Sequence, residues 1–218
     1  MADQRDPNFR ELRIDYGDAE LRRRDLPEDP LAFFRRWLDE ATEAGVREPN
    51  AMALATCDGD GQPHCRIVLL KQLDAQGFGF FTNKQSDKGA QLRQNQRAAV
   101  TFCWPAPRTR QVRIEGSMVE LPESVSDAYF QSRPRRAQLC SAASPQSAVV
   151  KDREALEGLV DALEQQVGDG EVRRPERWGG YALRPERIEF WQGRDGRLHD
   201  RFRFQLAGTG WLLDRLAP

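Results

Sequence analysis

The stretch AMALATCDGDGQPHCRIVLLK, residues 51–71, indicates how this chain folds. Its first seven residues alternate between larger and smaller side chains, and its last six, RIVLLK, place a short apolar run between two cations. The DGDGQP between them is rich in residues that favour tight turns, which is typical of a β-hairpin. We therefore predict two antiparallel strands, over residues 51–57 and 65–71.

The same pattern continues along the chain. Alternating or short apolar runs predict further strands in FGFFTN (78–83), AAVTFCW (98–104), RQVRIEGSMVEL (110–121), WGGYALR, ERIEFWQG, RFRFQL and GWLLDRL. Helices are predicted over residues 86–95, 122–133 and 151–166. About nine strands with few helices indicate an α+β fold, mainly antiparallel β, in a closed or nearly closed barrel with peripheral helices.

The N-terminal part has a different character. In DPLAFFRRWLDEATEAG, residues 29–45, apolar side chains recur at helical spacing, with Asp29 as N-cap, Pro30 at the first helical position and Gly45 at the end. Residues 1–28 are highly charged and poor in large apolar groups, which predicts a mobile arm that docks on the body or on a partner chain. We expect residues 29–218 to form one domain.

Composition limits the functions to consider. The 33 basic and 34 acidic side chains nearly balance, so we expect no general attraction to nucleic acid or membrane. The polar N-terminus and the lack of a long apolar run predict a cytoplasmic protein. Four scattered cysteines and two histidines do not suit a metal site, and we interpret the cysteines as small core residues. The glycine spacing does not match a Rossmann or P-loop nucleotide site.

Two segments have the residue types that bind phosphate. In TNKQSDKGAQL, Thr82, Ser86 and a helix N-terminus lie near Lys88, which would make a cradle of hydroxyls, backbone N–H groups and one ammonium. In YFQSRPRR, Tyr129 and Arg133 are four residues apart and suit a second anion on one helical face. The alternative interpretation of both is a surface helix or turn with solvated charges.

Three other segments are weaker candidates. Arg66 and Lys71 in RIVLLK point to opposite faces if the strand is unbroken. The polar loop SPQS, residues 144–147, offers amide and hydroxyl groups to a ligand. The turn RDGRLHDR places His199 between Arg197 and Arg201, and we expect Arg197 and His199 to alternate along one strand face. The alternative is a loop histidine without a function.

Taken together and in this order, the motifs RIVLLK, FFTN-x₂-S-x-K, RQVRIEG, YFQSRPR, SPQS, WGGY, IEFWQG-x₃-RLHDR and the terminal DRLAP give the chain a strong resemblance to the pyridoxamine 5′-phosphate oxidase family. The resemblance extends from LRIDY near the N-terminus to the last residue. It implies an FMN-binding split β-barrel that works as a homodimer, with the flavin sites at the subunit interface.

The resemblance also implies roles for individual residues. Those that match FMN-binding positions are Arg66, Ile67, Val68, Leu69, Leu70, Lys71, Phe81, Thr82, Lys88, Gln111, Gln146, Ser147, Trp191 and Arg201. The FMN phosphate is expected at Arg66 and Lys88, and the ring or ribityl parts nearer Gln111, Trp191 and Arg201. Lys71, Tyr129 and Arg133 match positions that hold the 5′-phosphate of the substrate. Arg197 and His199 match those that cover its pyridine ring, and Arg13 and Tyr16 match an N-terminal lid.

The activity implied is the FMN-dependent oxidation of pyridoxamine 5′-phosphate and pyridoxine 5′-phosphate by O₂, which gives pyridoxal 5′-phosphate and hydrogen peroxide. Arg197 and His199 would be the residues closest to the chemistry, orienting the substrate ring. The alternatives are a flavin oxidase of the phenazine-biosynthesis type and a non-catalytic protein that binds flavin or pyridoxal phosphate.

Two positions depart from the pattern that the resemblance implies at the phosphates. Asp87 stands where a second cation often precedes the phosphate-binding lysine, and an acid there should weaken the flavin phosphate site unless it turns to solvent. Ala137 stands where a serine often assists the substrate phosphate, which removes a hydroxyl donor worth about 0.5–1.5 kcal/mol. The segment CSAAS (140–144) also lacks an aromatic residue expected near that loop.

Overall fold

The computed structural model describes residues 15–218. Contacts between Cα atoms group the chain into two compact units. The first comprises Met1–Arg47, Cys103–Val112 and Glu189–Pro218, and the second Glu48–Phe102 and Arg113–Ile188. Three strands run from one unit into the other, so the single domain predicted from residue 29 stays a prediction.

The second unit is built on the predicted hairpins. Its strands are β1 (Ala51–Cys57), β2 (Pro63–Leu69), β3 (Gln72–Asp74), β4 (Gly77–Asn83), β5 (Arg97–Trp104), β6 (Arg110–Glu120) and β7 (Trp178–Gln192), the last three being shared with the first unit. They follow the order β2-β1-β5-β6-β7-β4-β3. β1 and β2 pair antiparallel from Ala51 opposite Leu69 to Cys57 opposite Pro63, which confirms the predicted hairpin. The mainly antiparallel α+β class is confirmed.

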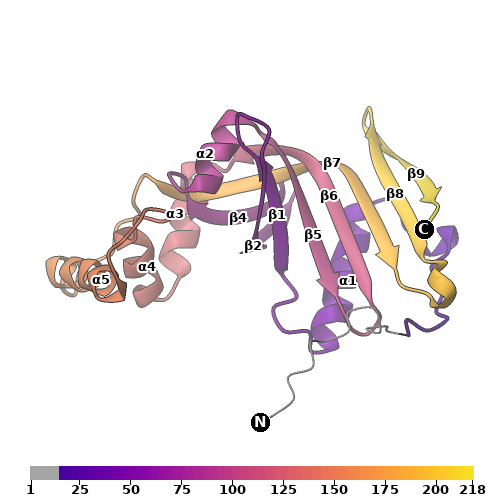
Figure 1. The fold of residues 1–218 in the computed structure, drawn as a ribbon, viewed down its shortest axis with the longest axis horizontal. Helices are drawn as coiled ribbons and strands as arrows, with labels where there is room; N and C mark the ends of the chain where they lie inside the picture. Colours follow the sequence, from indigo (N-terminus) through magenta and orange to yellow (C-terminus); the bar gives the residue numbers. More distant parts are fainter. Residues whose placement is uncertain (1–14) are drawn as a thin grey trace, which may run out of the picture. The chain divides into compact units, whose positions relative to one another are not determined.

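Four helices accompany this sheet. They are α2 (Asp87–Gln94), α3 (Glu123–Ser132), α4 (Arg135–Ala143) and α5 (Arg153–Val167), and Figure 1 shows α3, α4 and α5 grouped together. Phe130, Leu139, Val160 and Val172 form their buried cluster with Trp178 at the start of β7. This cluster fixes α3 and α4 against the first residue of β7, which is where the candidate site lies.

The first unit contains the predicted N-terminal helix, α1 (Pro30–Glu43). As predicted, the Asp29 side chain caps it by accepting a hydrogen bond of 2.8 Å from the Leu31 N–H, with Pro30 at the first helical position. Phe33, Phe34 and Trp37 point from α1 into the core and are at most 1% exposed. Each buried ring of this kind contributes about 1.5–3 kcal/mol to stability.

The remaining elements of the first unit lie at both ends of the chain. They are the 3₁₀ helices η1 (Arg23–Asp25) and η2 (Asp195–Arg197) and the antiparallel strands β8 (Asp200–Ala207) and β9 (Gly210–Leu216). The predicted arm is described from residue 15, and this part docks on its own chain. Leu21 is 5% exposed and donates its N–H to Asp200, and the Ala19 carbonyl accepts from Gln192.

The structure differs from the predictions at β7, which is one strand where two were predicted around Pro185. Proline lacks the N–H that a strand interior needs, so it suggested a break. The pairing of β4 with β7 ends at Leu183, however, so Pro185 lies beyond that ladder and no β4 hydrogen bond is lost. The predictions also missed β3 and α4 and ended the second strand at residue 71, two residues too late.

The interpretation of the cysteines as core residues was wrong. Cys65 and Cys103 are exposed and Cys57 and Cys140 are partly exposed, all four with free thiols. Within residues 15–218, no helix is both long enough and apolar enough to span a membrane.

Candidate functional site

A cavity of about 760 Å³ lies in the second unit, and its size is typical of a small-molecule or cofactor site. It brings together ten of the residues predicted for ligand binding. These are Ile67, Val68, Leu69, Lys71, Phe81, Thr82, Lys88, Tyr129, Arg133 and Gln146. They come from β2, β4, α2, α3 and the loops after β2, α3 and α4, so the fold gathers segments up to about 80 residues apart in sequence.

Lys88 lies at the centre of the predicted phosphate cradle. Its ammonium donates hydrogen bonds to Thr82 Oγ1 at 3.3 Å, Ser86 Oγ at 3.2 Å and Gln146 Oε1 at 3.1 Å. Ser86 is also the N-cap of α2, so the first backbone N–H groups of that helix lie beside the lysine. The cradle is therefore formed, and the SPQS loop contributes Gln146 to it.

Arg66 is the second cation near this cradle. Its guanidinium donates to the Leu54 carbonyl, to Thr56 Oγ1 at 2.6 Å and to Gln91 Oε1 at 2.9 Å. These three acceptors are neutral, and they hold the side chain between β1 and α2. The charge of Arg66 is thus positioned without being neutralised by them.

The electrostatics of the two cations favour an anion. Burial lowers the pKa of Lys88, and the charge of Arg66 lowers it further, while the Asp87 carboxylate opposes the shift. Burial likewise lowers the pKa of Arg66. Two like charges in a partly buried place destabilise each other, and a bound anion would relieve that repulsion. Asp87 itself is exposed, so it turns to solvent while its charge supports both cations.

The second predicted anion grip lines the same cavity. Tyr129 lies in the last turn of α3, and Arg133 follows as the C-cap in extended conformation, so the two do not share one helical face as predicted. Both still line the cavity, together with Lys71, which lies just beyond the end of β2. Burial lowers the pKa of Arg133 and raises the pKa of Tyr129.

An aromatic stack forms part of the cavity wall. The rings of Phe81 and Tyr129 are 4.1 Å apart at 24°, and Phe81 and Trp178 are 5.5 Å apart at 11°. The guanidinium carbon of Arg133 lies 5.0 Å from the centroid of the Trp178 ring, in cation–π contact. The stack therefore forms part of the cavity wall and also contacts Arg133, the cation of the second predicted anion site.

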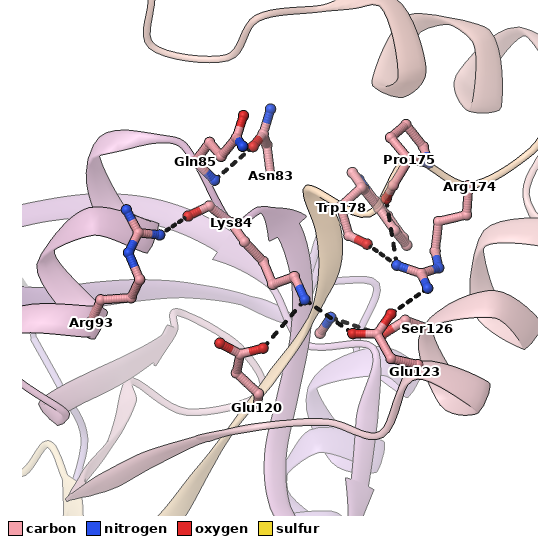
Figure 2. Close-up of polar contacts among 11 residues, drawn as sticks. Asn83, Lys84, Gln85, Arg93, Glu120, Glu123, Ser126, Arg174, Pro175 and Trp178 are labelled. Carbon is pink, nitrogen blue, oxygen red and sulfur yellow. Dashed lines mark hydrogen bonds and ion pairs between the residues drawn. The ribbon is translucent and has the colours of Figure 1, made fainter.

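A network of ion pairs links the three elements that supply this stack (Figure 2). Lys84, just after β4, lies 3.3 Å from Glu120 and 3.0 Å from Glu123. Arg174 pairs with Glu123 and, at 2.6 Å, with Asp127, and it donates to the carbonyl of Trp178. We call Lys84, Glu123 and Arg174 the clamp, because Glu123 joins the ends of β4 and β7 to α3.

Sequence reasoning missed the clamp and Trp178. Glu123 and Arg174 are 51 residues apart, and neither belongs to a local pattern that predicts their contact. The glycines of WGGY were a signal: a Cβ on Gly180 would lie 2.8 Å from Phe81 Cε1, so this strand must approach the stack closely. Asn83, Cys140 and Ser141 also line the cavity and were not predicted, whereas Ser144 of the predicted SPQS loop and Arg136 of YFQSRPRR line it as well.

A second cluster of predicted residues lies in the first unit. The Tyr16 ring packs edge-on against Trp191 and His199, with centroids 5.9 and 5.4 Å away, and Trp191 and His199 are 4.7 Å apart. His199 Nδ1 accepts a hydrogen bond of 3.1 Å from the Arg194 N–H, which leaves Nε2 as the ring nitrogen that carries a proton. The predicted lid residue Tyr16 thus touches the predicted ring-covering histidine.

Arg197 and His199 do not alternate along a strand, so that expectation was wrong. Arg197 lies in η2 with φ at +61°, and His199 lies in the link before β8. Ser147, another predicted site residue, has φ at +74°. Left-handed backbone is costly for residues other than glycine and clusters at functional sites.

The other predicted residues are placed as follows. Arg201 in β8 pairs with Glu189 at 2.8 Å, and Gln111 lies in β6; both belong to the first unit. Leu70 is buried in the second unit, and Ser147 accepts a hydrogen bond of 3.2 Å from the Asp87 N–H. Arg13 lies outside the described residues. The ligand roles of all these residues stay predictions.

Comparison with family models gives two matches that together cover most of the chain. The model described as pyridoxamine 5′-phosphate oxidase matches residues 38–167. The model described as pyridoxine 5′-phosphate oxidase C-terminal dimerisation region matches residues 178–218.

Curated relatives agree with these models. The chain is 53% identical over 210 residues to the pyridoxine/pyridoxamine 5′-phosphate oxidase of Pseudomonas fluorescens (strain SBW25), covering 95% of this chain and 97% of the relative. It is 51% identical over 211 residues to the enzyme of the same name from Salinibacter ruber (strain DSM 13855 / M31), covering 95% and 98%.

Solved structures confirm the split-barrel fold. PhzG from Burkholderia lata 383, in complex with tetrahydrophenazine-1-carboxylic acid, aligns with a TM-score of 0.86 and 34% identity over 93% of this chain and all of its own. A pyridoxamine 5′-phosphate oxidase-related, FMN binding protein from Nostoc punctiforme PCC 73102 aligns with a TM-score of 0.68 and 17% identity, covering 86% and 96%.

Proposed function

This chain belongs to the pyridoxamine 5′-phosphate oxidase family, and from that membership we propose that it makes pyridoxal 5′-phosphate with FMN as cofactor. Pyridoxine 5′-phosphate and O₂ give pyridoxal 5′-phosphate and hydrogen peroxide. Pyridoxamine 5′-phosphate, O₂ and water give the same two products and ammonia. The chain is thus an oxidoreductase of vitamin B6 biosynthesis and salvage.

One observation carries the proposal: a single cavity is lined by two sets of cations. Lys88 lines the cavity in one set, with Arg66 close to it but outside the lining, and Lys71 and Arg133, with Tyr129, form the other. A reaction between FMN and a B6 phosphate brings two ligands that each carry a phosphate into one site, and two separate sets of cations would hold those two phosphates. A site for one phosphorylated ligand would need only one of them.

The residues of the cradle fit the phosphate of FMN. Lys88 and Arg66 would bind it as cations, and Gln146 and Thr82 would add polar contacts beside them. Bound FMN would supply the redox chemistry of the reaction, the transfer of two electrons from the substrate to O₂. The chain supplies position and charge.

The protein groups around the substrate would bind and orient it. Arg133 and Lys71 would hold the 5′-phosphate by charge, and the Tyr129 hydroxyl would add a hydrogen bond. Arg197 and His199 would cover the pyridine ring, with His199 Nε2–H available as a donor. Fixing the reacting carbon in this way is a large part of what a protein contributes to a cofactor reaction.

We also propose a homodimer with FMN at the subunit interface. The dimerisation model covers Trp191, Arg197, His199 and Arg201, so residues expected at the ligands lie in the region expected to pair. Ile67 lines the cavity and is 66% exposed, an apolar side chain that a second subunit would cover. Residues from both chains would then complete each site.

A cytoplasmic location fits the cysteines. Two of the four thiols are exposed, and none is paired. Such thiols persist in a reducing compartment.

The test of the function is an oxidation assay on the purified protein loaded with FMN. We expect pyridoxal 5′-phosphate, oxygen consumption and peroxide release with pyridoxine 5′-phosphate. A yellow protein that consumes no oxygen would instead be a binding protein, and the proposal would be wrong.

The rival activity is that of the phenazine-type oxidase, since PhzG shares the fold. The tricyclic acid in that complex carries no phosphate, so it gives no use to the second set of cations at Lys71 and Arg133. Oxidation of a reduced phenazine carboxylate with no turnover of pyridoxine 5′-phosphate would favour the rival.

Substitutions of Arg197 in η2 and of His199 in the link after it should lower turnover without loss of bound FMN. We expect Arg197→Met and His199→Asn each to lower kcat/KM about tenfold or more, because each removes a polar contact to the substrate ring. Flavin absorbance per subunit should stay at the wild-type level. Loss of FMN from either variant would show that these residues belong to the cofactor site.

A further inference from the structure

We infer that the Ser141 hydroxyl contacts the substrate and donates a hydrogen bond to its phosphate. The inference rests on the proposed function and adds a specificity residue to it. Ser141 lies in α4, an element that the sequence did not predict, and lines the cavity together with Arg133.

The geometry fixes the direction of the hydrogen bonds. Arg133 Nη1 donates to Ser141 Oγ at 2.8 Å. A guanidinium can only donate, so the serine oxygen is the acceptor here and its own proton remains to be donated. A hydroxyl that accepts from an arginine and faces a cavity is suited to donate to an anion bound by that arginine.

The surroundings of Arg133 favour a bound anion. The side chain is partly buried, and burial lowers its pKa. Its contacts are the neutral Ser141 hydroxyl and the faces of the Trp178 and Phe130 rings, at 5.0 and 6.0 Å. These partners hold the guanidinium in place but leave its charge to be balanced by a ligand.

Ser141 also explains how α4 can serve a phosphate without a hydroxyl at residue 137. Ala137 and Ser141 are four residues apart in α4, so they lie on one face of the helix, about 6 Å apart along its axis. Placing the hydroxyl one turn later keeps it beside Arg133, because Arg133 reaches residue 141 directly.

The test compares serine variants of the FMN-loaded enzyme. For Ser141→Ala we expect KM for pyridoxine 5′-phosphate to rise about two- to tenfold, as for the loss of one hydrogen bond, with kcat changed less than about twofold. Ser141→Thr keeps the hydroxyl and should restore the wild-type KM. Ser132→Ala is the matched control, because the Ser132 hydroxyl donates to the Tyr129 carbonyl and does not line the cavity.

Two substrates separate a phosphate contact from a general effect. Oxidation of unphosphorylated pyridoxine should be equally slow in Ser141→Ala and wild type, because no phosphate is present. An unchanged KM for pyridoxine 5′-phosphate, or an equal loss with both substrates, would overturn the inference.

If the wild-type protein shows no oxidase activity, the proposed function fails. The affinity for pyridoxal 5′-phosphate, measured by equilibrium dialysis, then tests Ser141 on its own: two- to tenfold weaker binding by Ser141→Ala supports the contact, and equal binding refutes it.

Discussion

Lys88→Ala is expected to yield protein that purifies with little FMN and binds added FMN roughly 10- to 100-fold more weakly than the wild type. The ammonium is the cation at the centre of the cradle, and hydrogen bonds to charged groups are each worth about 1.5–3 kcal/mol. Its removal also leaves Thr82, Ser86 and Gln146 without their shared donor. Flavin absorbance per subunit and fluorescence titration with FMN measure the loss.

Lys151→Ala is the control for this variant, because Lys151 is 88% exposed and lies 3.6 Å from Asp152. It should bind FMN as the wild type does. Full FMN occupancy in Lys88→Ala, with turnover lost instead, would mean that the two phosphate sites are assigned the wrong way round.

The buried position of Lys88 gives the same interaction a pH dependence. Burial lowers its pKa, so the ammonium loses its proton at a lower pH than an exposed lysine does. The affinity for FMN should therefore fall as the pH rises through the alkaline range. Lys88→Arg keeps its charge at these pH values and should show a flatter profile.

The second large effect is expected at Arg133. Arg133→Met should lower kcat/KM for pyridoxine 5′-phosphate about 30- to 150-fold, because it removes a partly buried guanidinium that would pair with the phosphate. FMN content should not change, because within residues 15–218 Arg133 forms no hydrogen bond with the cradle of Lys88.

Methionine retains most of the apolar bulk that packs on Trp178, so the stack should survive the change. Oxidation of pyridoxine, which lacks the phosphate, should be nearly the same in Arg133→Met and wild type. Arg135→Met, which alters an exposed arginine bound to the Gly170 carbonyl, is the control. If pyridoxine oxidation fell as steeply as that of the phosphate, Arg133 would act on the fold and not on the phosphate.

The parts predicted well from the sequence are those set by short-range patterns. The hairpin of residues 51–71, the cap at Asp29 and the grouping of Thr82 and Ser86 around Lys88 depend on residues close together in the chain. Hydrophobic periodicity, turn residues and helix caps act over that range, so a single sequence is enough to predict them.

The parts that the sequence could not reveal depend on distant contacts. The partner of Lys88 in the SPQS loop is 58 residues away, and Arg174 is 47 residues from Asp127. Pro185 misled the strand prediction because its effect depends on which neighbouring strand pairs there. The cysteines were wrongly predicted to be buried for a similar reason, since burial is decided by packing and not by residue type alone.

The clamp has a further consequence for how this wall of the cavity breaks down. Glu123 is shared by Lys84 and Arg174, and Asp127 adds a second ion pair between Arg174 and α3, so the end of β4, the start of β7 and α3 are joined by one set of ion pairs. Segments joined in this way tend to open together as one cooperative unit. A ligand that binds only the closed wall would then protect all three segments from local unfolding at once. Ligand occupancy of the cavity and local unfolding of its wall would therefore report on the same equilibrium.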